Sequence, residues 1–159
     1  MRSNTMSKYH QILFLSTTNT CRGYMAEVLM RKELWKRGIK EVEVSSRGTI
    51  VLFSEPINPK AVLVMKNNDL PVEEDYLTQP LTEEDVKKSD LILTMTEEQK
   101  ESLLQEYDYS GDIYTVKELG REKGEVLDPY GKDLIDYEYC CRELDRLIEK
   151  IADAIFEEK

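Results

Sequence analysis

The chain has 159 residues, of which 40% are hydrophobic and 34% are charged, and its formal net charge is −10. This length fits one domain with a proper core, and the composition is that of a globular protein. The acidic excess repels nucleic acid and anionic membranes, so neither is an expected partner. An anionic substrate therefore has to be bound by a local site that overcomes the general field.

The three cysteines, Cys21, Cys140 and Cys141, form no spaced framework, which favours reduced thiols and a cytoplasmic location. The start of the chain lacks the apolar segment of a signal peptide, and no apolar run approaches the ~20 residues of a membrane span. We expect a polar lead over 1–9 and one domain over 10–159. The only histidine is His10 and there is no His/Cys cluster, so we expect no metal. We expect no cofactor either.

Apolar runs alternate with amphipathic runs along the domain. The run QILFL at 11–15 predicts a buried strand. Apolar positions at helical spacing predict a helix over 24–37, which Gly38 would end. A second strand is expected at 42–49, and a helix at 59–66 follows a proline-bearing loop.

The second half of the chain continues this alternation. Residues 82–90 carry acidic side chains first and lysines last, which suits a short helix and its dipole. Thr96 and Gln99 form the pattern of a capping box at a helix start. The remaining expected elements are a strand at 91–95, a helix at 96–107, a strand at 112–116, a glycine-rich loop at 117–132 and a last helix at 133–156.

Regular alternation of strands and helices predicts an α/β fold, with a four-stranded parallel sheet flanked by helices on both faces in a single three-layer domain. About five helices fit this length. Ligands in such folds bind at the carboxyl ends of the strands. Ser16, Arg47, Met95 and the loop after Val116 would all lie at that edge.

The residues between the first strand and the first helix predict an anion site. A tight loop that leads into a helix aims backbone N–H groups at one point, and the helix dipole adds about half a positive charge. Arg22 offers a fork of donors, and Asn19 tolerates a left-handed backbone. Thr17, Thr18 and Thr20 add hydroxyl groups. The alternative is a polar turn in which the arginine pairs with a carboxylate.

The order of residues in this loop resembles the signature loop of the low-molecular-weight protein-tyrosine phosphatases. That family has a cysteine, five residues, an arginine, a serine or threonine, and usually Pro-Met-Ala-Glu. The matching residues here are Asn19, Cys21, Arg22, Met25, Ala26 and Glu27. Further similar stretches are SSRGT at 45–49, SDLILTMT at 89–96 and EVLDPYGK at 125–132. The resemblance covers nearly all of the chain from residue 11 onward.

The resemblance implies a hydrolase of the protein phosphatase type, in which the loop cysteine attacks phosphorus as a thiolate. It implies Arg22 as the phosphate clamp and Asp128 as the general acid and later base. Tyr130 would line the substrate wall, and Asn19 and Ser46 would brace the loop. The implied phosphate-binding set is Thr17, Thr18, Asn19, Thr20, Cys21, Arg22 and Gly23. The alternatives are an Asp-Pro turn for Asp128, a core or surface aromatic for Tyr130 and a strand-end hydroxyl for Ser46.

Thr20 bears on the substrate. Tyrosine-specific members have a bulkier aliphatic residue at this position, whereas members similar to the bacterial protein-arginine phosphatases have threonine. A small polar residue leaves room for a hydrated nucleophile or a guanidinium group. Phosphotyrosine and phosphoarginine proteins therefore both remain candidate partners, with small aryl phosphates, inorganic phosphate and sulfate as simpler ligands of the loop.

The resemblance places Ser16 where the family has its nucleophilic cysteine. A hydroxyl is far harder to ionise than a thiol with its ordinary pKa of ~8.5, and a serine phosphoester is hard to break. His10 lies six extended residues, or about 20 Å, before Ser16, which excludes a Ser–His pair. Gly23 and Tyr24 also depart from the pattern. These joint changes favour a natural protein with little or no turnover over the alternative, an engineered cysteine-to-serine substitution.

The functional readings that stay open are an impaired phosphatase and a non-catalytic pseudophosphatase that binds phosphoproteins. Cys21 matches the family's second loop cysteine, but with Ser16 it has no thiol partner there, so we expect a buried thiol. As a displaced nucleophile it would point away from phosphorus. An arsenate reductase would need further cysteines in a mobile segment, whereas Cys140 and Cys141 fall in the last predicted helix.

Overall fold

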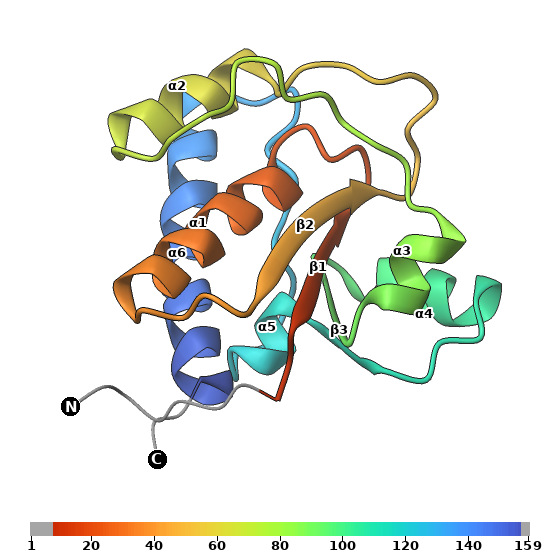
Figure 1. Ribbon diagram of the computed structural model, residues 1–159. Coiled ribbons are helices and arrows are strands. Elements are labelled where there is room, and N and C mark those ends of the chain that lie inside the picture. The colour runs from red at the N-terminus through yellow and green to blue at the C-terminus, as the bar shows by residue number, and fades with distance from the viewer. Residues whose placement is uncertain (1–7, 157–159) are drawn as a thin grey trace.

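A four-stranded parallel sheet forms the centre of the computed structural model, which describes residues 8–156 (Figure 1). Its strand order is β2-β1-β3-β4. The two inner strands, β1 and β3, have almost only buried residues, as expected when helices cover both faces of a parallel sheet. The strands are β1 (Gln11–Ser16), β2 (Glu43–Gly48), β3 (Leu91–Thr94) and β4 (Asp112–Thr115).

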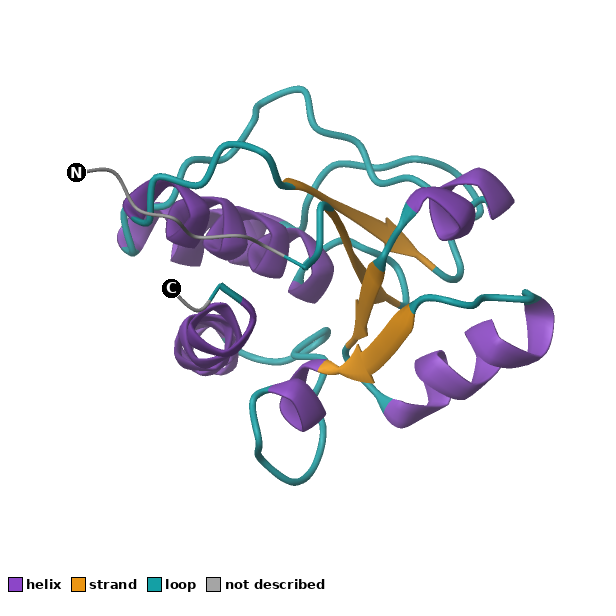
Figure 2. Cartoon of the chain, turned by 60° about the horizontal axis from the view of Figure 1, so that its bottom comes forward, coloured by secondary structure: helices purple, strands orange, loops and turns teal. Residues whose placement is uncertain are grey.

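Helices pack on both faces of this sheet (Figure 2). The helices are α1 (Arg22–Lys36), α2 (Pro59–Asn67), α3 (Glu83–Lys88), α4 (Glu97–Glu106), α5 (Val116–Leu119) and α6 (Leu134–Ile155). Figure 1 shows α1 and α6 together on one side of the sheet, with α3 and α4 on the other. The predicted three-layer α/β fold is therefore confirmed.

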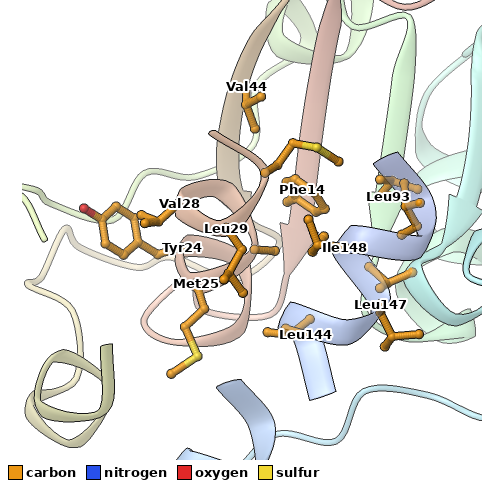
Figure 3. Close-up of a cluster of buried hydrophobic side chains, with 14 of the residues drawn as sticks. Phe14, Tyr24, Met25, Val28, Leu29, Val44, Leu93, Leu144, Leu147 and Ile148 are labelled. Carbon is orange, nitrogen blue, oxygen red and sulfur yellow. The ribbon is translucent and has the colours of Figure 1, made fainter. Parts of the chain in front are cut away.

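Alternate residues of β1 supply the two halves of the core. Phe14 packs with side chains of α1 and α6, among them Leu29 and Ile148 (Figure 3). Leu13 and Leu15 point the other way and join the smaller cluster beneath α3 and α4. Both faces of β1 are buried in this way, and Ser16 at its carboxyl end is buried as well.

Most element boundaries agree with the prediction to within two residues. Helix α1 begins at Arg22, two residues earlier than expected, and is followed by Gly38 with φ 68°. The capping box of Thr96 and Gln99 forms as predicted. Helix α5 begins at Val116, the last residue of the strand predicted at 112–116, and extends into the stretch predicted as a loop at 117–132. It is too short to show a helical period and is capped by Thr115.

The polar lead predicted at 1–9 lies, for residues 1–7, outside the described residues. His10 is exposed at the entry to β1, and its backbone N–H donates to Asp90 Oδ2 at 2.8 Å. Between residues 8 and 156, no helix combines the length and the apolar character that crossing a membrane requires.

Candidate functional site

The 16–23 loop joins the end of β1 to the first turn of α1, and its carbonyl groups are bound from outside. The N–H of Thr49 donates to the Ser16 carbonyl at 2.9 Å, and the N–H of Ile50 donates to the Thr17 carbonyl at 2.8 Å. The N–H of Asn58 donates to the Thr20 carbonyl at 2.9 Å. Neighbouring segments therefore hold the loop by its carbonyl side.

The N–H groups of the same loop are left without acceptors. Within residues 8–156, the backbone N–H groups of Thr17, Thr18, Asn19 and Thr20 donate to no protein atom. Asn19 has φ 64°, the left-handed conformation expected from the sequence, and such turns orient successive N–H groups toward one point. The loop and the start of α1 therefore offer several unpaired donors, which suits an anion.

Arg22 follows the loop as the first residue of α1, and the residue is only 4% exposed. Its NH1 group donates to the Val126 carbonyl at 2.9 Å, and its NH2 group lies 3.6 Å from Asp128 Oδ2. The carboxylate of Asp128 is 40% exposed, so it lies toward solvent from the guanidinium. The segment after α5 therefore positions the buried cation and places an accessible carboxylate next to it.

A buried hydrogen-bond network supports the loop from behind. Asn19 Nδ2 donates to the Tyr76 hydroxyl at 2.8 Å and to the Ser46 carbonyl at 3.4 Å. Ser46 Oγ donates to Glu27 Oε1 at 2.6 Å and is 3.1 Å from the Tyr76 hydroxyl. Glu27 also pairs with Arg31 at 2.6 Å. Burial raises the pKa of both Tyr76 and Glu27, although the hydrogen bonds from Ser46 partly oppose this.

Two buried oxygen atoms of the loop have no partner among the described residues, Ser16 Oγ and Asn19 Oδ1. Both lie beside Gly23, where a Cβ atom would come within 2.8 Å of each. Leaving such an atom buried and unpaired costs about 1–3 kcal/mol, so it normally faces a ligand or water. Gly23 thus keeps open a small polar space at the base of the loop.

The remaining predicted site residues lie around this centre. Tyr130 is 74% exposed and its N–H donates to Asp128 Oδ1 at 3.1 Å, so it stands at the rim. Thr17 Oγ1 accepts from Gln99 Nε2 at 3.0 Å, and the Thr18 and Thr20 hydroxyls are 2.9 Å apart.

Cys21 is buried, as expected. A hydrogen bond with Cys140 and burial together hold the pKa of the Cys21 thiol well above its ordinary value. Both effects disfavour the thiolate that a nucleophile requires.

Two residues of the hydrogen-bond network behind the loop, Glu27 and Tyr76, were not predicted as site residues. Glu27 stood in the matching Met-Ala-Glu stretch without a predicted role, and Tyr76 lies in a loop where nothing in the sequence marked it. Arg47 was expected at the carboxyl edge of the sheet. Its Nε donates to Asp85 Oδ2 at 3.0 Å, and its NH1 group donates to the Ser46 carbonyl at 2.7 Å. Arg47 therefore contacts the network behind the loop through Ser46.

Comparison with known proteins gives the class of protein that this fold and loop represent. The family model of the low molecular weight phosphotyrosine protein phosphatases matches residues 11–159, and the chain belongs to that family. The resemblance predicted from the loop is thereby confirmed at the level of the family.

The relatives of this chain are named for two different phosphatase activities. The chain is 33% identical over 141 residues to the low molecular weight protein-tyrosine-phosphatase PtpB of Staphylococcus haemolyticus, covering 89% of this chain and 96% of that protein. It is 32% identical over 143 residues to the protein-arginine-phosphatase of Bacillus subtilis, covering 89% and 93%. A solved structure of the YwlE arginine phosphatase, a cysteine-to-serine mutant with a phosphorylated active-site serine, superposes with a TM-score of 0.86 at 31% identity, covering 92% and 96%.

Proposed function

We propose that this chain binds the phosphorylated side chain of a protein in the 16–23 loop. The observation that carries the proposal is a buried Arg22 guanidinium, fixed by the Val126 carbonyl, at the end of a loop that has four backbone N–H groups without acceptors. A phosphate dianion matches these donors, because backbone N–H groups and an arginine fork form charge-assisted hydrogen bonds to its oxygens. Inorganic phosphate and sulfate are expected to bind in the same place.

Asp128 is proposed as the general acid of the family reaction. Its carboxyl group is accessible and lies at the solvent side of Arg22, where the leaving group of a bound phosphate would emerge. A protonated Asp128 would protonate that leaving group, and the resulting carboxylate would activate the water that attacks the intermediate. Tyr130 at the rim would contact the substrate ring or alkyl chain.

Ser16 is proposed to occupy the position of the nucleophile, where it makes turnover very slow. Within residues 8–156, its hydroxyl has no hydrogen-bond partner and therefore no base to remove its proton. The YwlE mutant with a phosphorylated active-site serine supports the view that a serine there can hold a phosphoryl group. We infer that Ser16, if phosphorylated, keeps its phosphoester, because a serine alkoxide is a poor leaving group.

The same missing base favours a second candidate function, a pseudophosphatase that recognises phosphoproteins without hydrolysing them. The relatives are named for phosphotyrosine and for phosphoarginine chemistry, and Thr20 favours the latter. We also propose a cytoplasmic location, supported by the three free cysteines, Cys21, Cys140 and Cys141.

The test combines binding with rescue of hydrolysis. Titration calorimetry with inorganic phosphate should give saturable binding to the chain, and absence of binding would remove the proposal itself. If the impaired phosphatase is right, Ser16→Cys should hydrolyse an aryl phosphate and a phosphoarginine peptide. Asp128→Asn in the Ser16→Cys background should then lower the aryl phosphate rate by about 10²- to 10⁴-fold. Phosphate binding without any rescue would identify the pseudophosphatase instead.

A further inference from the structure

A cavity of about 390 Å³ lies beside the proposed phosphate site, between the 16–23 loop and α4. We call it the α4 cavity. One wall is formed by Thr17 of the loop and by Thr49 and Ile50, whose N–H groups hold that loop. Gln99 of α4 joins the two walls, because its Nε2 donates to Thr17 Oγ1 at 3.0 Å. The α4 cavity therefore adjoins the loop at Thr17, one of the residues whose backbone N–H groups lack acceptors.

The wall formed by α4 is acidic. Glu98, Ser102 and Glu106 recur every four residues, so they share one face of the helix, and all three line the cavity. Within the described part of the chain, the carboxylates of Glu98 and Glu106 form neither an ion pair nor a hydrogen bond. The two negative charges are therefore uncompensated at the rim of the cavity.

Another part of the cavity lining is apolar and includes one aromatic residue. Leu15, Leu81 and Leu103 line it together with Tyr107. Burial raises the pKa of the Tyr107 phenol, and the charges of Glu106, Glu83 and Asp85 raise it further, which indicates a negative field there. Buried leucines beside exposed carboxylates in one cavity match an alkyl chain that carries a positive charge. The aromatic face adds attraction for a cation.

We propose that the α4 cavity binds a lysine or arginine side chain of the phosphorylated protein, close in sequence to its phosphorylated residue. This inference rests on the proposed function, since the phosphate in the 16–23 loop anchors the same partner. The net charge of the chain explains why such a basic residue would strengthen binding. A protein with net charge −10 repels the phosphate group of a phosphorylated side chain, and a basic residue next to that phosphate offsets the repulsion locally.

The experiment measures the affinity of the chain for labelled peptides by fluorescence anisotropy. One series carries phosphotyrosine and another phosphoarginine, each with neutral flanks or with a single lysine at each flanking position in turn. The variants are Glu98→Gln, Glu106→Gln and both together. The matched control is Glu101→Gln, which removes the same charge from an exposed position of α4 that does not line the cavity.

A lysine at one or two flanking positions should strengthen binding, and each cavity variant should weaken that peptide about two- to fivefold. Binding of the neutral peptide should change no more than it does in Glu101→Gln. The inference is overturned if no flanking lysine strengthens binding, or if Glu101→Gln lowers the lysine preference as much as the double variant does. Failure of inorganic phosphate and of every phosphopeptide to bind would instead overturn the proposed function, and the inference with it.

Discussion

Removing the Tyr76 hydroxyl tests whether the buried network positions the 16–23 loop. In Tyr76→Phe, Asn19 Nδ2 loses its 2.8 Å bond and keeps only the 3.4 Å contact with the Ser46 carbonyl. Asn19 is 1% exposed and its Oδ1 already has no partner among the described residues, so water cannot easily replace the lost bond. One buried hydrogen bond and one poorly paired donor correspond to about 1–2 kcal/mol in the free energy of unfolding.

Urea unfolding followed by circular dichroism measures that change, and a thermal scan should show a fall in Tm of about 2–8 °C. The phosphate affinity should fall too, because Asn19 is the left-handed residue that orients the loop N–H groups. The matched control is Tyr139→Phe, which removes a hydroxyl from a side chain that is 66% exposed. Equal stability and phosphate affinity in both variants would refute the reasoning.

Two further predictions concern the charge and the thiols of the site. Arg22→Lys removes the fork of donors and the 2.9 Å bond to the Val126 carbonyl, so phosphate affinity measured by calorimetry should fall about 10- to 100-fold. An affinity within twofold of the original would contradict the role of Arg22 as a clamp. Cys21, Cys140 and Cys141 are buried, and burial raises the pKa of Cys141 to about 12. All three should react with a disulfide reagent at neutral pH only after unfolding, and rapid labelling of the folded chain would disprove this.

The secondary structure could be predicted because it follows from local patterns. The apolar run of β1 and the helical spacing of α1 reflect burial along the chain, and Thr96 with Gln99 marks a helix start through contacts only three residues apart. Helix α5 escaped prediction because four residues show no period. The start of α1 was predicted two residues too late, because Arg22 and Gly23 resemble loop residues in the sequence but form the first turn of the helix.

The network behind the loop could not be predicted in the same way. Asn19, Ser46 and Tyr76 come from three separate segments, and nothing local in the sequence near Tyr76 distinguishes it from a surface tyrosine. That Arg22 and Asp128 belong to one site was expected only through the resemblance to a family, because 16–23 and 125–132 are far apart in the chain.

The sequence alone determined the layered parallel fold, the loop at the end of β1 and the serine at its first position. Periodicity and composition carry this information, because each element buries the face that its own residues make apolar. Only the tertiary structure decided which donors lack acceptors, how Tyr76 and Glu27 support the loop, and that Glu98 and Glu106 face a cavity beside Thr17. These features depend on the strand order, which brings segments that are distant in the sequence to one edge of the sheet. That order results from the packing of whole elements against one another and not from local sequence patterns.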